Sequence, residues 1–112
     1  MRLTQLEAYA LTIGIEALVA ARLGPRFGAK RGRAALAAAG GSALTHPVVW
    51  WGALALYTRI GMSAVPLLEL FAILAEAVGY RYLAVPRWRA ALLLSGITNA
   101  VSWALGAAIT AL

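Results

Sequence analysis

The sequence predicts an all-α protein that crosses a membrane four times, and three observations support this fold class. The chain has 112 residues, of which 62% are hydrophobic and only 12% are charged, and its mean hydropathy is +0.80. A soluble domain of this size needs charged residues at roughly a quarter to a third of its surface positions, and this chain has too few. The apolar residues also gather in four long runs, separated by short stretches rich in glycine, proline and arginine.

Each of the four runs is long enough to cross the ~30 Å hydrocarbon core of a bilayer as a helix rising about 1.5 Å per residue. The predicted spans cover approximately residues 3–23, 34–57, 64–83 and 90–111, so the whole chain, 1–112, forms one transmembrane domain. A signal peptide is the alternative for the first run. Glu7 and Glu16 interrupt its apolar centre, however, so we expect a helix that is retained.

The basic residues predict the orientation. Eight of the ten Lys and Arg residues lie in or beside the loops 24–33 and 84–89, which leaves only Arg2 and Arg59 at the opposite end. The positive-inside rule then places these two loops in the cytoplasm and both chain termini outside. Topology and anionic lipid headgroups therefore explain the net charge of +6, and we expect no nucleic-acid partner. The aromatic residues expected at the interfaces are Tyr80, Tyr82 and Trp88 inside and Tyr57 outside.

All four acidic residues fall inside predicted spans, where a charged side chain costs roughly 2.5–3.5 kcal/mol at the centre of the bilayer. Glu69 and Glu76 are seven residues apart, which places them on nearly the same face of a helix. Glu7 lies near the outer end of its span and is expected to be solvated. When positions are counted from the middle of each span, every span has a polar residue at a similar depth in the membrane. The predicted ligand or proton site consists of Glu16, His46, Glu69, Glu76 and Asn99.

Two alternatives to a proton site remain open. A divalent metal such as zinc, manganese or iron could use Glu16, His46 and Glu76 as ligands. The same polar residues could instead be hydrogen-bonding contacts between helices, which are worth ~0.6 kcal/mol each in a membrane. The residues to which this structural interpretation applies most readily are Ser95, Thr98, Asn99 and Ser102.

Several kinds of chemistry are excluded by composition. The chain has no cysteine, and because its four acidic residues are all glutamate it has no aspartate either. Cysteine-based metal sites and a Ser-His-Asp triad are therefore impossible. No Glu-x-x-His pair of the di-iron type is present, and the single histidine could hold a haem only in a dimer. We expect no conventional enzyme.

The segment GGSALTHPVVWW predicts a break in the second span. Pro47 has no amide hydrogen and leaves the carbonyl of Ala43 without its usual donor, while Gly40 and Gly41 weaken the helix nearby. Interrupted helices at membrane depth commonly line binding sites. A simple kink with close glycine packing is the alternative.

A weak internal repeat suggests two helical hairpins in tandem. Arg33-Ala-Ala-Leu36 recurs as Arg89-Ala-Ala-Leu92, at the start of the second and fourth spans. Glu16-Ala-Leu likewise resembles Glu76-Ala-Val. If the repeat is real, a pseudo-twofold axis along the membrane normal relates the hairpins, and the two glutamates face each other across it.

Three patterns together resemble a group of small bacterial four-helix integral membrane proteins of uncharacterised function. These patterns are Thr45-His46-Pro47-x-x-Trp50, the Glu69–Glu76 pair, and Ser95-x-x-x-Asn99-x-x-Ser102-x-x-x-Gly106. The resemblance covers the second to fourth spans. It implies the fold, the polar residues and a location in the inner membrane of a bacterium, and it implies no activity, ligand or partner.

The sequence therefore predicts binding or transport of a proton or small cation at a polar site within the membrane. The alternative is an accessory or anchoring subunit of a larger membrane complex, in which Trp50, Trp51 and Trp103 pack against a lipid, a quinone or a pigment. A chain of this size encloses little volume. In either role we expect a homo-oligomer or a larger complex.

Overall fold

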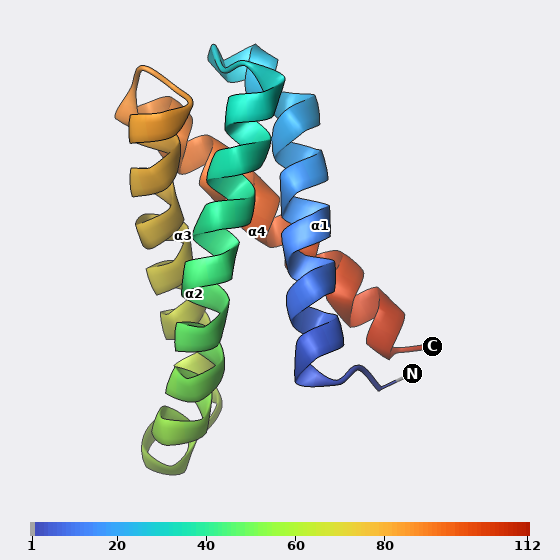
Figure 1. Ribbon diagram of the computed structural model, residues 1–112. Helices are drawn as coiled ribbons and strands as arrows, with labels where there is room; N and C mark the ends of the chain where they lie inside the picture. Colours follow the sequence, from blue (N-terminus) through green and yellow to red (C-terminus); the bar gives the residue numbers. More distant parts are fainter. Residues whose placement is uncertain (1) are drawn as a thin grey trace.

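The computed structural model describes residues 2–112, and this part of the chain is helical with no strands (Figure 1). The all-α prediction is confirmed. Four α-helices, α1 to α4, lie close to the four predicted segments. The short 3₁₀ helix η1 connects α1 to α2, and a second one, η2, connects α2 to α3. Their bounds are α1 Gln5–Leu23, η1 Gly24–Phe27, α2 Arg31–Ile60, η2 Gly61–Ser63, α3 Ala64–Leu83 and α4 Trp88–Thr110.

Local sequence signals explain where these helices begin and end. α1 starts with a capping box, in which the Thr4 hydroxyl accepts a hydrogen bond from the Glu7 amide and the Glu7 carboxylate accepts one from the Thr4 amide. Two glycines adopt the positive φ that other residues avoid, Gly28 (φ 88°) after η1 and Gly61 (φ 63°) after α2. The exposed Glu7 thus caps a helix and lies away from the buried polar residues, as expected of a residue at the end of a span.

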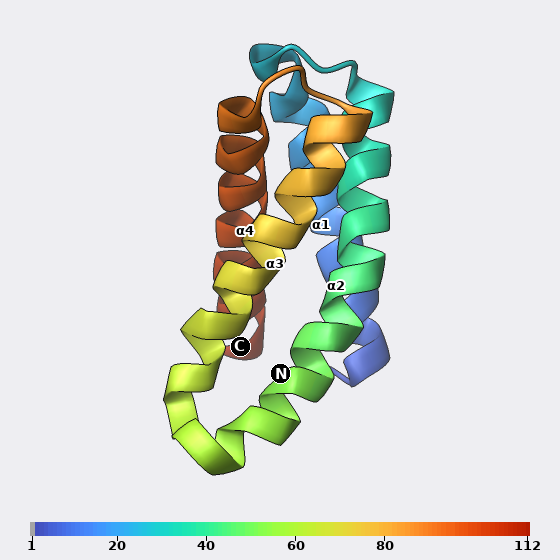
Figure 2. The same cartoon turned by 90° about the vertical axis from the view of Figure 1, so that its left-hand side faces the viewer.

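The predicted break in the second helix is wrong. α2 runs without interruption through Pro47 for 30 residues. Figure 2 shows its second half inclined away from the line of its first half, so the proline accompanies a bend and not a gap in the helix. The helix stays intact because another side chain satisfies the carbonyl that Pro47 leaves free, as described below.

The helices form a bundle in which each packs beside its neighbours in the chain and α4 closes the ring against α1. α1 and α3 therefore lie diagonally opposite each other, as do α2 and α4. Both termini lie at one end of the bundle, and η1 and the α3–α4 connection lie at the other (Figure 1). At the end with the termini, the α2–α3 hairpin diverges from α1 and α4 (Figures 1 and 2).

The end that holds η1 is closed by small residues. The core cluster there consists mainly of alanines from all four helices and the first loop, together with Tyr80, Val85 and Leu94. Arg33, at the start of α2, donates a hydrogen bond from Nε to the carbonyl of Leu83, the last residue of α3. The predicted interfacial position of Tyr80 is wrong, because this side chain is fully buried and donates to the Thr98 hydroxyl at 3.3 Å. Its neighbour Tyr82 is exposed and packs edge-on against Trp88.

Two helical segments of the described chain are long and apolar enough to cross a membrane. They are Arg31–Leu83, which contains α2, η2 and α3, and Trp88–Thr110, which is α4. α1 has only 19 residues, and these include Glu7, Glu16 and Arg22. α1 is therefore not one of these two segments. It carries Glu16, one of the two most deeply buried carboxyl groups.

Candidate functional site: a buried carboxyl pair beneath a cavity

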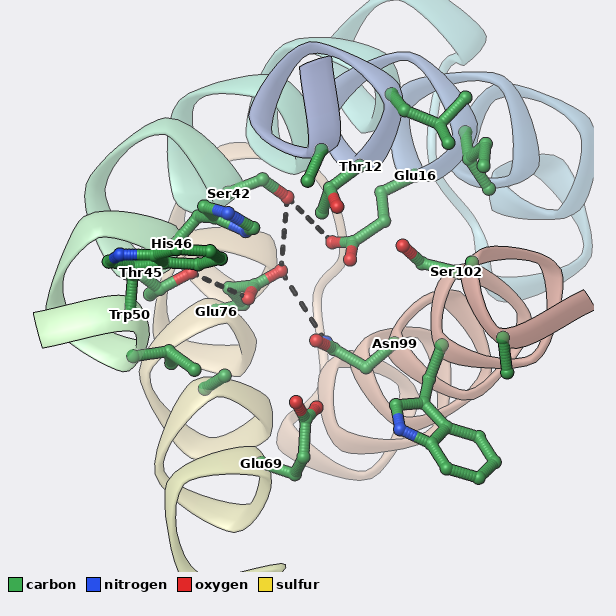
Figure 3. A pocket seen from close by; sticks show the side chains of 18 of the residues that line it. Thr12, Glu16, Ser42, Thr45, His46, Trp50, Glu69, Glu76, Asn99 and Ser102 are labelled. Atoms are coloured by element: carbon green, nitrogen blue, oxygen red, sulfur yellow. Dashed lines mark hydrogen bonds between the residues drawn. The ribbon is translucent and has the colours of Figure 1, made fainter. Parts of the chain in front are cut away.

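A cavity of about 500 Å³ lies between the four helices. It extends from the middle of the bundle, where Glu16 and Glu76 line it, to Leu3 and Thr110 near the two chain termini. The alanine-rich core closes the bundle beyond the carboxyl groups. All five residues of the predicted ligand or proton site line this cavity, and Figure 3 shows them together with the hydroxyl residues around them.

Glu76 lies close to polar side chains of two other helices. It is 2% exposed, and its Oε2 accepts from the Thr45 hydroxyl at 2.8 Å. Its Oε1 lies 3.4 Å from the Asn99 side-chain amide, which also donates to it, and 3.5 Å from the Ser42 hydroxyl. The carboxyl group of α3 is therefore held between donors from α2 on one side and α4 on the other (Figure 3).

Glu16 approaches the same point from α1. It is also 2% exposed, and its Oε1 accepts from the Ser42 hydroxyl at 2.6 Å. Ser42 thus lies between two carboxyl groups that are 60 residues apart in the sequence (Figure 3). The diagonal arrangement of α1 and α3 brings the glutamates together across the bundle, which is the relationship that the tandem-hairpin hypothesis predicts.

The two carboxyl groups share a single hydroxyl donor, Ser42. Ser42 has one hydroxyl hydrogen and can donate it to only one carboxyl group at a time. No lysine or arginine is among the residues that line the cavity. Two ionised carboxylates that are buried side by side without a cation repel each other and lose their hydration. A proton on one of them removes the repulsion, and a bound cation compensates both charges.

Gly41 allows the two helices to approach at this point. A Cβ atom at Gly41 would lie 3.1 Å from Glu76 Cγ, closer than ordinary van der Waals contact, whereas one at Gly40 would meet nothing within 4 Å. Of the two interpretations of the glycine pair, close packing therefore applies to Gly41. The missing side chain makes room for the Glu76 carboxyl arm.

Glu69 lies about two helical turns from Glu76 on the same face of α3, as its spacing predicts. It is half-buried, it lines the cavity, and its carboxyl group points toward Asn99 (Figure 3). The residue between them on this face, Ala72, also lines the cavity. Glu69 thus adds a third carboxyl group to the cavity wall, on the side toward the termini.

His46 occupies the cavity wall, away from the carboxyl pair. Its ring packs against Tyr9 at 5.4 Å and against Trp50 at 6.4 Å between ring centroids, and its Nε2 is buried with no hydrogen-bond partner in the described chain. Among residues 2–112, no group of three His, Cys, Asp or Glu side chains could hold a metal ion. The predicted metal site of Glu16, His46 and Glu76 is therefore not formed, because the imidazole stacks between aromatic rings instead of joining the carboxyl groups.

Tyr9 supplies the hydrogen-bond donor that Pro47 lacks. Its hydroxyl donates to the carbonyl of Ala43 at 2.8 Å, and this is the carbonyl that an amide at position 47 would have bonded. The aromatic ring of Tyr9 also contacts His46. One tyrosine of α1 thus stabilises the bent helix α2 and positions the histidine beside the bend.

Three residues of this site were missed by the sequence analysis: Ser42, Thr45 and Tyr9. Ser42 and Thr45 are three residues apart and share a helix face, so their spacing was a usable signal. Nothing in the sequence indicates that Tyr9 reaches a carbonyl 34 residues away.

The polar residues of α4 divide between two roles. Ser95 donates to the carbonyl of Ile73 at 2.7 Å, and Thr98 accepts from Tyr80, so both connect α4 to α3 as structural contacts. Asn99 donates to Glu76 and to the carbonyl of Ser95, and both Asn99 and Ser102 line the cavity. Of these four residues, only Asn99 and Ser102 line the cavity.

The fold and the site together define a class, namely an all-helical bundle that has a buried carboxyl cluster at the closed end of an internal cavity. Comparison with protein-family models, with curated proteins and with solved structures finds no match for this chain. The resemblance to small bacterial four-helix membrane proteins therefore stays a prediction that rests on the motifs quoted above.

Proposed function

We propose that this protein spans the bacterial inner membrane four times and binds a proton or small cation at the Glu16–Glu76 pair, as part of transport or of reversible binding. The observation that carries the proposal is the convergence of two almost fully buried carboxyl groups on one serine hydroxyl, at the closed end of a cavity. Ionisable groups in such positions commonly mark proton or ion pathways in membrane proteins.

The distribution of charge supports the orientation in this proposal. The closed end of the bundle carries η1 and the α3–α4 connection, where most of the arginines lie, and the cavity extends toward the opposite end. With the basic end in the cytoplasm, the carboxyl pair has access from the outer side and is separated from the inner side by the alanine-rich core. A change in the packing of that core would be needed for a proton or cation to cross.

Proton flux into proteoliposomes tests this function directly. Vesicles that contain the purified protein and an entrapped pH-sensitive dye receive a potassium diffusion potential, and the rate of acidification is compared with that of empty vesicles. We expect the wild-type protein to raise the rate and Glu76→Gln to abolish the increase, because an amide cannot carry the proton.

Glu7→Gln is the matched control, since it makes the same chemical change at the one acidic residue outside the cavity and retains the ability to cap α1. It should behave as wild type. A purely binding role predicts no flux but a proton that Glu16 or Glu76 carries, visible as an infrared carbonyl band of a buried carboxylic acid that disappears in Glu76→Gln. Absence of both the flux and the band would contradict a proton at this pair and leave the small cation as the proposed ligand.

A second candidate function, as an accessory or anchoring subunit, is favoured by a different observation. Large apolar side chains project from the bundle, among them Leu44 (77% exposed), Met62 (69%) and Trp51 (64%). Lipid tails would cover them in a membrane, and so would a partner subunit or a second copy of the chain. Native mass spectrometry of the protein extracted in mild detergent distinguishes these cases, because a stoichiometric partner would move the function to assembly.

A further inference from the structure

The cavity is larger than a proton or a bare metal ion requires. Its volume of about 500 Å³ falls within the roughly 300–1,000 Å³ range of pockets that hold small organic ligands. Residues from all four helices line it. A site for an inorganic cation alone would need converging ligands, and no metal-binding group of three is found among residues 2–112.

The charge of the cavity has one sign. Its titratable side chains are Glu16, Glu69, Glu76 and His46, and neither lysine nor arginine is among the lining residues. The amide oxygen of Asn99, a residue only 7% exposed, accepts no hydrogen bond from the part of the chain that the structure describes, so this acceptor is free for a ligand. Every charged carboxylate here attracts a positive ligand, and no fixed positive charge competes with it.

The walls of the cavity are apolar and aromatic. Leu11, Ile15 and Val49 line it together with Trp50 and Trp103. Indole faces attract organic cations through the ring quadrupole as well as through apolar contact. A ligand that packs against the apolar walls and also pairs with the carboxyl groups at the closed end therefore combines an apolar body with a positive charge.

We propose that the cavity binds a lipophilic organic cation, whose charged centre lies near Glu16, Glu76 and Asn99 and whose apolar groups contact Trp50 and Trp103. This inference rests on the proposed cation site and names its substrate class. An anion of the same shape is disfavoured, because carboxylates repel it and no lysine or arginine lines the cavity to compensate its charge.

Equilibrium dialysis with radiolabelled tetraphenylphosphonium tests the proposal on the detergent-purified protein. Tetraphenylborate serves as the matched probe, because it has nearly the same shape and the opposite charge. We expect saturable binding of the phosphonium at one site per chain and no saturable binding of the borate. Glu76→Gln should weaken phosphonium binding about tenfold or more, and Glu7→Gln should leave it unchanged.

Trp103→Ala keeps the test decisive if Glu76→Gln does not fold. The Trp103 side chain is 62% exposed, so its truncation leaves the core intact, and loss of the aromatic wall should weaken binding several-fold. Equal binding of both probes, or an absence of saturable phosphonium binding, would overturn the inference. Proton flux through the same preparation would then still support the proposed function, so the two failures are distinguishable.

Discussion

Tyr9 and Pro47 compensate for each other across two helices. Proline at position 47 leaves the Ala43 carbonyl without an intrahelical donor, and an unpaired carbonyl in a dry environment is costly. The Tyr9 hydroxyl, 2.8 Å away, removes this cost. The bend in α2 and the position of His46 therefore depend on a residue of α1.

We expect Tyr9→Phe to lower the free energy of unfolding by about 1 kcal/mol, because it removes the only side-chain donor to Ala43 O in the described chain. In a Pro47→Ala background the amide of residue 47 can donate instead, so the same tyrosine substitution should cost much less. Thermal unfolding of the four proteins of this double-mutant cycle measures the difference. Equal costs in both backgrounds would show that the hydrogen bond does not compensate for the proline.

Close packing between α2 and α3 depends on glycines at particular positions. Gly41 faces the arm of Glu76, and a Cβ at Gly52 would lie 2.9 Å from a methyl group of Leu68. Both glycines permit the helices to approach, as small residues do at helix contacts in membranes. Through Gly41, this packing also determines where the carboxyl group of α3 meets the donors of α2.

Gly41→Ala and Gly40→Ala make the same change at adjacent positions with different surroundings. Alanine favours helix over glycine by roughly 0.5–1 kcal/mol, so Gly40→Ala should be neutral or stabilising, since nothing lies within 4 Å. The free energy of unfolding of Gly41→Ala should be about 1–2 kcal/mol lower than that of Gly40→Ala, because the new methyl group displaces Glu76 from Thr45 and Ser42. Denaturant titration in detergent measures both. If the two variants are equally stable, the contact with Glu76 is not close in solution.

The described chain buries polar side chains such as Glu16, Glu76 and Asn99 and exposes many large apolar ones, and most of its basic residues lie toward the closed end. This arrangement matches a bilayer as solvent. In the proposed four-span arrangement, both termini and η2 lie on one side of the membrane and the two basic connections lie on the other.

Labelling of single-cysteine variants tests this topology in a chain that has no native cysteine. A maleimide that cannot cross membranes should react in intact cells at three exposed positions and at two others only after permeabilisation. The first three variants are Gln5→Cys, Met62→Cys and Leu112→Cys, and the other two are Lys30→Cys and Pro86→Cys. Equal reactivity of Gln5→Cys and Lys30→Cys would show that α1 does not cross the membrane. The reverse pattern would invert the orientation.

The four helices could be predicted from the sequence because apolar runs and their glycine and proline boundaries are local signals. The same is true of the shared face of Glu69 and Glu76, which follows from helical period alone. The course of α2 could not be predicted in this way, since the cost of Pro47 depends partly on whether another group donates to the Ala43 carbonyl. Tyr9, which satisfies it, belongs to another helix.

The sequence by itself determined that the protein is helical, that its acidic residues lie within apolar segments, and that its positive charge gathers at two loops. Composition and periodicity are sufficient for these properties, because each depends on neighbours along the chain. Only the tertiary structure decided which polar groups meet. In the folded chain Ser42 lies between Glu16 and Glu76. His46 packs against Tyr9 and Trp50 and does not join the carboxyl groups, and Tyr80 is buried in the core. These outcomes depend on the rotation and bend of each packed helix, and packing between distant segments sets both.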